Sequence, residues 1–237
     1  MPCAKPCDIL ITGANRGLGL AMTERLLALG YRIWVIHRHK SRRLDALQKK
    51  SPDRLFCFSA DVADEKSVQR AMKAVSSRSD RIDVLINNAA VHLDPERFPI
   101  EKVDFSVYLP TFRVNTVAPL IVAKHALPML RKGEKKLIVN ISSEAGSIGA
   151  AWRKSEYAYC MSKSALNMAN QILQNYLKDE GFKVLAVHPG WFTSDMGGKE
   201  APISPEEAAK KVVDVILNPP DLSGPSFVDS DGKTMLW

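Results

Sequence analysis

Short apolar runs alternate along the chain with longer segments whose apolar residues recur at helical spacing. The runs at 8–13, 32–36, 55–62, 84–86, 137–141 and 183–187 predict strands, and a short strand or edge piece is expected at 227–228. Helices are expected at about 18–29, 64–77 and 107–130, in a segment that ends near 179, and after Ser204–Pro205. This alternation predicts an α/β protein: a single-domain Rossmann fold over residues 1–237, with a doubly wound parallel sheet of about seven strands flanked by helices.

Three local signals refine this outline. Gly30 is placed to end the first helix. Asn115 falls inside the predicted helix 107–130, where asparagine is mildly unfavourable, and this indicates a task beyond packing. The stretches 91–105 and 193–203 are predicted as loops because prolines, glycines and charges interrupt them, and the second could fold over a bound ligand.

The composition is that of an ordinary soluble globular protein, with 46% hydrophobic and 25% charged residues among 237. No apolar run reaches the roughly 18–20 residues that span a bilayer, and the N-terminal residues lack the apolar region of a signal peptide. We therefore expect a cytoplasmic protein with no membrane partner. The four cysteines show no C-x-x-C spacing and are expected as reduced thiols, and the five histidines lack metal-ligand spacing, so no metal is expected.

The formal net charge is +7, and basic residues gather at 38–50 and at 131–136. Such clusters can bind nucleic acid. However, no aromatic residues interleave with these charges, as a stacking platform for bases would need. We expect no nucleic-acid partner, and the cluster at 131–136 is more simply explained as a solvated turn between a helix and a strand.

A glycine-rich turn, Ala14-Asn15-Arg16-Gly17-Leu18-Gly19, joins the first strand to the first helix. Glycines let a backbone approach a diphosphate, which then lies on the open N–H groups and the positive end of the helix dipole. Strand, glycine turn and helix together predict a dinucleotide site, whereas a tight turn without a ligand is the simpler alternative.

The end of the second strand indicates which dinucleotide binds. Sites that select NAD usually place Asp or Glu there to accept from the ribose 2′-hydroxyl, but this chain continues with His37-Arg38. Arg38 and Arg16 are cations suited to a 2′-phosphate. The expected cofactor is therefore NADPH, and the first basic cluster has a local explanation.

The segment 137–163 carries the candidate chemistry. An apolar run ends in Ser142-Ser143, and Tyr159 and Lys163 then lie four residues apart, on one face of a helix. A neighbouring cation favours the phenolate and lowers a tyrosine pKa, and a strand-end hydroxyl could hold a carbonyl oxygen while the tyrosine supplies a proton. Tyr157 has only Met161 at the same spacing. An ordinary exposed helix pair is the alternative interpretation of Tyr159 and Lys163.

Five motifs occur in a characteristic order over nearly the whole chain: Thr12-Gly13-x-x-x-Gly17-x-Gly19, Asn87-Asn88-Ala89, Asn115, Ser143 and Tyr159-x-x-x-Lys163. With them the chain resembles the short-chain dehydrogenase/reductase superfamily. Within it, the wide gap between Ser143 and Tyr159, the residues Pro189-Gly190-Trp191, and Asp195-Met196-Gly197-Gly198 are similar to carbonyl reductases of the Sniffer and C-factor type.

The resemblance implies a catalytic set. Tyr159 would be the general acid for ketone reduction, Lys163 would bind the nicotinamide ribose, Ser143 would hold the carbonyl, and Asn115 would position a water in a proton relay. It also implies an NADP-binding domain with these cofactor contacts: Gly13, Asn15, Arg16, Gly17, Leu18, Gly19, Arg38, Asp61, Val62, Asn88, Ala89, Ala90, Tyr159, Lys163, Pro189, Gly190, Trp191 and Thr193.

Two positions test this assignment. The superfamily usually continues Asn-Asn-Ala with Gly, whereas this chain has Ala90, so a slight adjustment of the backbone is expected beside the cofactor. Ser142 competes with Ser143, and the superfamily usually uses the second serine of this pair.

The expected function is an NADPH-dependent reductase of ketones, aldehydes or quinones. The alternative is a cofactor-binding regulatory or signalling protein with little turnover. The substrate stays open, because Trp152, Trp191, Phe192 and Met196 could line a pocket or pack in the core or in a lid. So does the oligomeric state, for which a homodimer and a homotetramer are both options.

Overall fold

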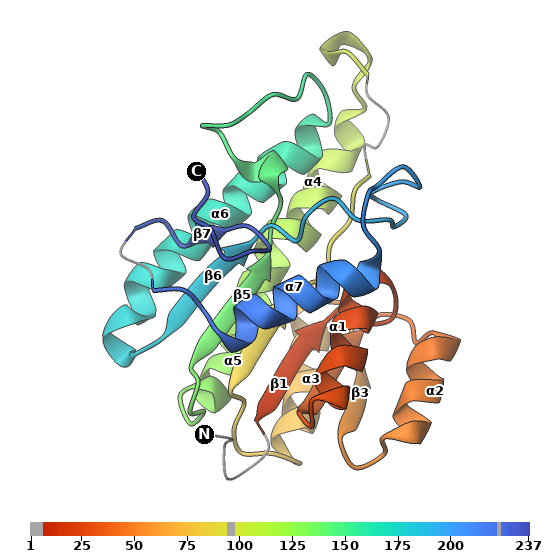
Figure 1. Ribbon diagram of the computed structural model, residues 1–237, viewed down its shortest axis with the longest axis vertical. Helices are drawn as coiled ribbons and strands as arrows, with labels where there is room; N and C mark the ends of the chain where they lie inside the picture. Colours follow the sequence, from red (N-terminus) through yellow and green to blue (C-terminus); the bar gives the residue numbers. More distant parts are fainter. Residues whose placement is uncertain (1–6, 94–97, 222–223) are drawn as a thin grey trace.

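A computed structural model describes residues 7–93, 98–221 and 224–237. Its centre is a sheet of seven strands in the order β3-β2-β1-β4-β5-β6-β7 (Figure 1), and every neighbouring pair is parallel. The strands are β1 (Asp8–Thr12), β2 (Arg32–His37), β3 (Leu55–Ser59), β4 (Val84–Asn87), β5 (Leu137–Ile141), β6 (Lys183–Val187) and β7 (Phe227–Val228). The strand order reverses between β1 and β4, and in such sheets ligands bind in the crevice beyond the carboxyl ends of the strands. The predicted fold class is confirmed.

Helices cover both faces of this sheet (Figure 1). They are α1 (Gly17–Ala28), α2 (Arg42–Lys50), α3 (Glu65–Ser76), α4 (Tyr108–Phe112), α5 (Ala118–Leu130), α6 (Tyr157–Leu177) and α7 (Pro205–Leu217). One buried apolar cluster joins α1, α2 and α7 to the sheet, and a second joins α3, α5 and α6 to it. Apart from the edge strand β3, the strands are short and almost wholly buried because both of their faces meet helices.

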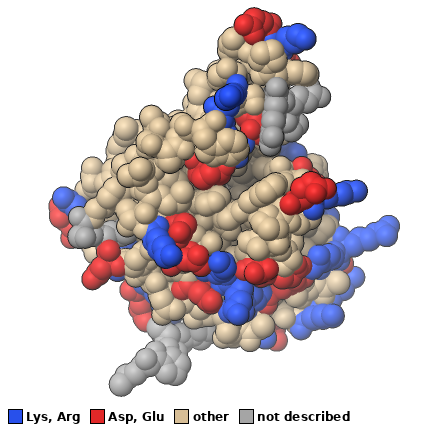
Figure 2. Space-filling model, turned by 45° about the horizontal axis from the view of Figure 1, so that its top comes forward, with Lys and Arg blue, Asp and Glu red and all other residues tan. Residues whose placement is uncertain are grey.

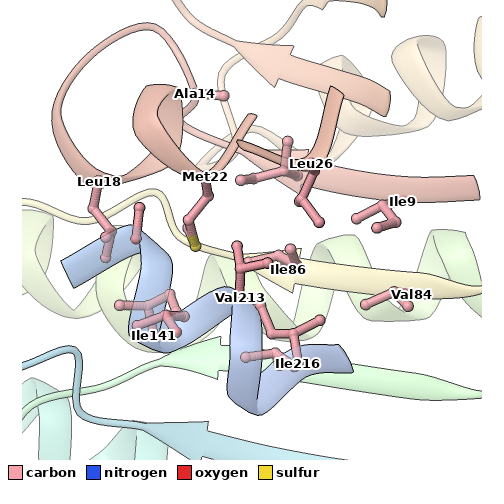
Figure 3. Close-up of a cluster of buried hydrophobic side chains, with 14 of the residues drawn as sticks. Ile9, Ala14, Leu18, Met22, Leu26, Val84, Ile86, Ile141, Val213 and Ile216 are labelled. Carbon is pink, nitrogen blue, oxygen red and sulfur yellow. The ribbon is translucent and has the colours of Figure 1, made fainter. Parts of the chain in front are cut away.

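Figure 3 shows how α1 and α7 pack on the first face. Leu18, Met22 and Leu26 lie three to four residues apart on α1, so all three point inward, toward the strands and toward Val213 and Ile216 of α7. Met22 and Leu26 are fully buried. Gly30 follows α1 with φ of +92°, a left-handed conformation that suits glycine, and it ends the helix as predicted.

One helix was not predicted, and the end of one strand was predicted wrongly. α2 was not predicted, although Ser41 caps it by accepting a hydrogen bond from the Leu44 N–H at 3.1 Å. Its only buried residue is Leu44, so the apolar periodicity that marks other helices is too sparse here. β3 ends at Ser59 instead of residue 62, because the Asp61 carboxylate accepts from the Ala63 N–H and turns the chain.

The long helix expected at 107–130 is interrupted in its middle. Arg113–Val117 form a π-helical turn between α4 and α5, and Asn115 is the buried residue of that turn. Single π turns inside helices occur often at functional sites, because the inserted residue displaces the local hydrogen bonds. The asparagine that looked misplaced on a regular helix therefore lies on an irregular one.

The helical stretch Phe105–Leu130 is, by length and composition alone, apolar enough to cross a membrane, with a mean hydropathy of 1.2. The expectation that no such segment exists was therefore too strong. One third of the most apolar window is buried in the protein, and the inner face of α5 packs with α3 and the sheet. A core helix of a Rossmann fold meets the same criterion, so this stretch is weak evidence for a membrane span.

We expect Leu26→Ala to lower the free energy of unfolding by about 2–5 kcal/mol, because it opens a cavity under α1. Urea denaturation measures the change. Leu29→Ala is the matched control, since Leu29 is 50% exposed and its truncation should change stability by no more than about 0.5 kcal/mol. Equal losses in the two variants would contradict the packing described for α1.

Candidate active site

A cavity of about 1060 Å³ opens at the carboxyl ends of the strands, beside the point where the strand order reverses. The glycine turn, the ends of β2, β4, β5 and β6, and the first turns of α6 line it. Ligand pockets usually measure about 300–1,000 Å³, so this one can hold a large ligand such as a dinucleotide together with a small second molecule.

Two glycines of the turn allow a close crossing of the backbone. A Cβ atom on Gly13 would lie 2.8 Å from the Ala89 Cα, and one on Gly19 would lie 2.6 Å from the Gly13 carbonyl oxygen. Asn88 fixes this crossing, because its Nδ2 donates to the carbonyl oxygens of Thr12 at 2.9 Å and Gly13 at 3.1 Å. The glycines therefore make room for the neighbouring strand end as well as for a ligand.

The N-terminus of α1 is suited to an anion. Arg16 precedes the helix without a side-chain cap, and the first turn carries no acidic residue, so its N–H groups face the cavity without a competing carboxylate. His37, at the end of β2, is 6% exposed, and its Nδ1 has no hydrogen-bond partner among the residues described. A dinucleotide fits both features, through its diphosphate and through the polar groups of its adenosine half.

Five more of the expected cofactor contacts lie on the cavity wall. Asp61 and Val62 follow β3, and Asn88, Ala89 and Ala90 follow β4. The backbone of Ala90 is outside the left-handed region, so no glycine is needed there. The expected adjustment beside a bound cofactor stays a prediction.

The two arginines expected at a 2′-phosphate have different surroundings. Arg38 is exposed, lines the cavity and forms no ion pair within the described ranges. Arg16 also lines the cavity but pairs with Asp195, on the segment that follows β6. Part of the first basic cluster is paired locally, since Lys40 and Lys49 share Asp45 and Arg43 pairs with Glu24. Figure 2 shows basic and acidic side chains interspersed over the lower part of the face in view.

Ser143 and Tyr159 meet at the opposite side of the cavity. The Ser143 side chain interacts with the Tyr159 phenol and lowers its pKa, and Ser143 Oγ donates to Glu144 Oε2 at 2.6 Å. The Ser142 hydroxyl turns away and donates to Asn167 Oδ1 at 2.6 Å. The geometry therefore favours Ser143 over Ser142 as the residue beside the tyrosine, because only its hydroxyl reaches the phenol.

Burial dominates the titration of the Tyr159 and Lys163 pair. It raises the pKa of Tyr159 to about 12, against a lowering by the hydrogen bond from Ser143. It also lowers the pKa of Lys163 to about 8. The expectation that the ammonium lowers the tyrosine pKa is not met here, because Lys163 Nζ lies 5.8 Å from the centre of the tyrosine ring and donates to the Ile141 carbonyl oxygen at 2.8 Å.

Asn115 lies behind the cavity wall and is not among its lining residues. Its Nδ2 donates to the Val91 carbonyl oxygen and to Ser162 Oγ, and its Oδ1 accepts from the Val91 N–H. The side chain therefore ties the π turn to the segment after β4 and to α6.

The expected cofactor contacts Pro189, Gly190 and Trp191 line the cavity, together with Trp152, Phe192 and Met196, whose position had been open. Thr193 does not line it. Its hydroxyl lies 3.3 Å from the Ile203 carbonyl oxygen, so this threonine stabilises the segment 193–203. Among the described residues, no group of His, Cys, Asp or Glu could hold a metal ion.

Residues 8–203 match the family described as short chain dehydrogenase. The chain belongs to the short-chain dehydrogenase/reductase family. As a member, it is an oxidoreductase that uses a nicotinamide cofactor and acts on a small molecule. The resemblance that the sequence motifs indicated is confirmed.

Relatives of this short-chain dehydrogenase/reductase include C-signal of Myxococcus xanthus, which is 38% identical over 158 residues, or 66% of this chain and 93% of that protein. Among solved structures, carbonyl reductase Sniffer of D. melanogaster matches with a TM-score of 0.91 and 30% identity. The NADPH-bound carbonyl reductase from chicken fatty liver matches with a TM-score of 0.87 and 30% identity. Each of these two matches covers 98% of this chain and 100% of the other.

The cavity of this short-chain dehydrogenase/reductase also holds residues that the sequence analysis missed. Glu144, Arg153 and Glu156 are charged, and His92 and His188 are titratable. Burial lowers the pKa of His188. No spacing along the chain marked these residues, because they come from irregular segments on three separate parts of the sequence.

We expect Lys163→Met to stabilise the protein at pH 7. The folded pKa of about 8 lies below the ordinary value of 10.5, so the protonated lysine opposes folding below pH 8, and this opposition fades as the pH rises toward 10.5. The gain should be on the order of 3 kcal/mol at most, reduced by the lost hydrogen bond, and should shrink between pH 8 and 10.5.

Urea denaturation of both proteins across this pH range measures the effect. Lys66→Met, at an exposed position, is the control and should change stability little at any pH. If Lys163→Met is no more stable than the wild type at pH 7, burial does not penalise this ammonium as described.

Proposed function

We propose that the protein is an NADPH-dependent carbonyl reductase that transfers hydride to a ketone, aldehyde or quinone, with Tyr159 as the general acid. One observation carries the proposal. Ser143 and Tyr159 stand together on the wall of a cavity that also contains the glycine turn and Arg38, and the serine side chain interacts with the phenol. A proton donor and a second hydroxyl thus stand where a carbonyl oxygen can meet both.

The chemistry needs one proton for each hydride, because the carbonyl becomes an alcohol. The bound nicotinamide supplies the hydride. With a pKa raised to about 12, Tyr159 is a phenol at neutral pH and can give its proton as negative charge develops on the carbonyl oxygen. Ser143 would donate a second hydrogen bond to that oxygen and so stabilise the same charge.

Two further residues would support this proton transfer. Lys163 is 2% exposed and lies beneath the tyrosine ring, where its ammonium group would bind the ribose hydroxyls of the cofactor. The Asn115 side chain is already engaged by Val91 and Ser162. If this residue joins a water relay, the backbone of the π turn would hold the water.

The preference for NADPH rests on the end of β2. No acidic residue stands there to accept from a ribose 2′-hydroxyl, and Arg38 lines the cavity without an ion-pair partner among the described residues. The chicken fatty liver relative is described as NADPH-bound. Arg16 would contribute less than Arg38, because it must exchange Asp195 for the phosphate.

A second candidate function is regulation or signalling with little turnover, in which cofactor binding sets the state of the protein. The relative named C-signal favours it. Measuring NADPH oxidation with a panel of carbonyls, beside NADPH binding alone, separates the two candidates.

Self-association as a homodimer or homotetramer is part of the proposal. Large apolar side chains are exposed along α4, α5 and α6, among them Leu109, Leu120, Met168, Ile172 and Tyr176. Contiguous exposed apolar surface is typical of an interface between subunits.

We expect Tyr159→Phe to lower turnover by about 10²–10⁴-fold with little change in NADPH affinity, because it removes the transferable proton and keeps the ring. Steady-state kinetics and a cofactor titration measure the two effects. Tyr157→Phe is the matched control two residues away and should be mild. Near-normal turnover of Tyr159→Phe would contradict the assignment of the general acid.

We expect Arg38→Ala to raise the KM for NADPH by about tenfold or more and to leave that for NADH little changed, because a charge-assisted hydrogen bond contributes about 1.5–3 kcal/mol and exposure reduces it. Arg38→Asp should move the preference toward NADH, since its carboxylate repels the phosphate and accepts from a free 2′-hydroxyl.

The control is Arg42→Ala, an exposed arginine outside the cavity, measured at the same ionic strength. A wild type that prefers NADH, or an Arg38→Ala protein with unchanged constants for both cofactors, would contradict the role of Arg38.

A further inference from the structure

Three charged side chains form a cluster next to Ser143 and Tyr159. Arg153 lies between two carboxylates, with Nη2 2.5 Å from Glu144 Oε1 and Nη1 2.5 Å from Glu156 Oε2. All three residues line the cavity. The arginine neutralises one of the two negative charges and orients both carboxylates.

This cluster contacts the reacting residues at both of its ends. Glu144 Oε2 accepts the Ser143 hydroxyl proton at 2.6 Å. At the other end, Glu156 Oε1 lies 3.5 Å from His92 Nε2, and the ring centre of His92 lies 4.4 Å from that of Tyr159. Since Ser143 also interacts with Tyr159, these contacts connect the cluster to the tyrosine from two sides.

Glu156 of this cluster has a strained backbone conformation. Glu156 has φ of +63° and ψ of +40°, a left-handed conformation that glycine or asparagine adopts more readily, and its side chain is 7% exposed. Strained residues of this kind persist where surrounding contacts hold them and they gather at functional sites. Here the ion pair with Arg153 holds the strained residue directly before α6, next to Tyr157 and three residues from Tyr159.

The Ser143 hydroxyl has a single proton to donate. It can go to Glu144 or to a substrate carbonyl oxygen, and the two acceptors compete. A carboxylate is the stronger acceptor because it is charged. The carboxylate becomes a weaker hydrogen-bond acceptor when a guanidinium binds its other oxygen, as Arg153 does in Glu144.

We propose that Glu144 and Arg153 are positioning residues that set the direction of the Ser143 hydroxyl proton. Glu144 orients the hydroxyl, and Arg153 keeps this acceptor weak enough for a carbonyl substrate to displace it. The inference rests on the proposed carbonyl reduction for its kinetic consequences. A simpler role is that Arg153 only anchors the segment before α6, where its guanidinium also lies 5.1 Å from the ring centre of Trp152.

A double-mutant cycle separates these roles. We expect Arg153→Met to lower kcat/KM for a carbonyl substrate by about 10- to 100-fold, because the unneutralised Glu144 retains the Ser143 proton. NADPH affinity should change by less than about twofold. Adding Glu144→Gln should restore most of the loss, since a neutral amide is a weaker acceptor and its N–H can donate to Ser143 Oγ.

Lys154→Met is the matched control: it removes the same charge from the adjacent, exposed position and should leave kcat/KM within about twofold. If the double variant loses the product of the two single losses, Arg153 only anchors the segment and the proposal is overturned.

A titration of the tyrosine tests the proposal without turnover. The groups that face Tyr159 are Ser143, Glu144, Arg153, Lys163, His92 and Cys160. The wild-type pKa is raised to about 12. In Glu144→Gln it should fall, because the loss of the carboxylate charge and a stronger hydrogen bond from the released Ser143 hydroxyl both favour the phenolate, and in a Ser143→Ala background the fall should be clearly smaller, since only the charge effect is left. The ¹³C NMR shift of the Tyr159 Cζ in tyrosine-labelled protein reports the titration.

The two proposals can fail separately. A wild type that binds NADPH and reduces no carbonyl contradicts the proposed function, and the titration then decides the inference. A fall in pKa that depends on Ser143 supports it. An unchanged pKa in Glu144→Gln, or the same fall without Ser143, overturns it.

Discussion

The crossing of the glycine turn over the end of β4 sets the position of every group in the cavity. Thr12 Oγ1 accepts from the N–H groups of Asn88 and Ala89, and the Asn88 side chain returns two hydrogen bonds to the turn. These contacts lie where the strand order reverses, so they join the two halves of the sheet. They place the N-terminus of α1, which can bind an anion, opposite the hydroxyl groups that follow β5. Because a Cβ atom on Gly13 or Gly19 would collide there, the chemistry of the turn is inseparable from its packing.

A second constraint is a line of buried amides that crosses the sheet. Asn87 of β4 donates to Asn140 of β5, Asn140 donates to Asn170 of α6, and Asn170 donates to Ser226 next to β7. A buried polar group without a partner is costly, so this line specifies one lateral position for α6 where apolar contacts alone would tolerate several. α6 carries Tyr159 and Lys163, and its position decides which strand-end serine the tyrosine meets. The buried Lys163 ammonium donates to the Ile141 carbonyl oxygen, and its burial costs stability, as expected of a residue kept for the proposed role in the site.

Features that depend on residues close together in the sequence were predicted, and features that depend on contacts between distant segments were not. Strands β1 to β6 were predicted to within a few residues, since each is a short apolar run and all but β3 are buried on both faces. Gly30 and Ser204–Pro205 marked helix ends by local backbone chemistry. α2 was missed because one buried leucine is too little for a periodic pattern. The only sign of the π turn in the sequence was an asparagine at an unfavourable helix position. Whether a helix contains such an inserted residue depends on the elements that it packs against.

For the site, the sequence by itself determined which groups could take part: the glycine turn, Arg38 after β2, a serine after β5, and Tyr159 one helical turn from Lys163. Each follows from the spacing of residues within a short segment, and the sequence gives this spacing directly. Only the tertiary structure decided the partners. In the folded protein Ser142 contacts Asn167, whereas Ser143 contacts Tyr159. Arg16 pairs with Asp195, and Thr193 lies outside the cavity. Glu144, Arg153 and Glu156 form a cluster next to Ser143 and Tyr159. These contacts depend on distance and burial between separate elements, as do the directions of the pKa shifts of Tyr159 and Lys163, and no pattern along the chain records either quantity.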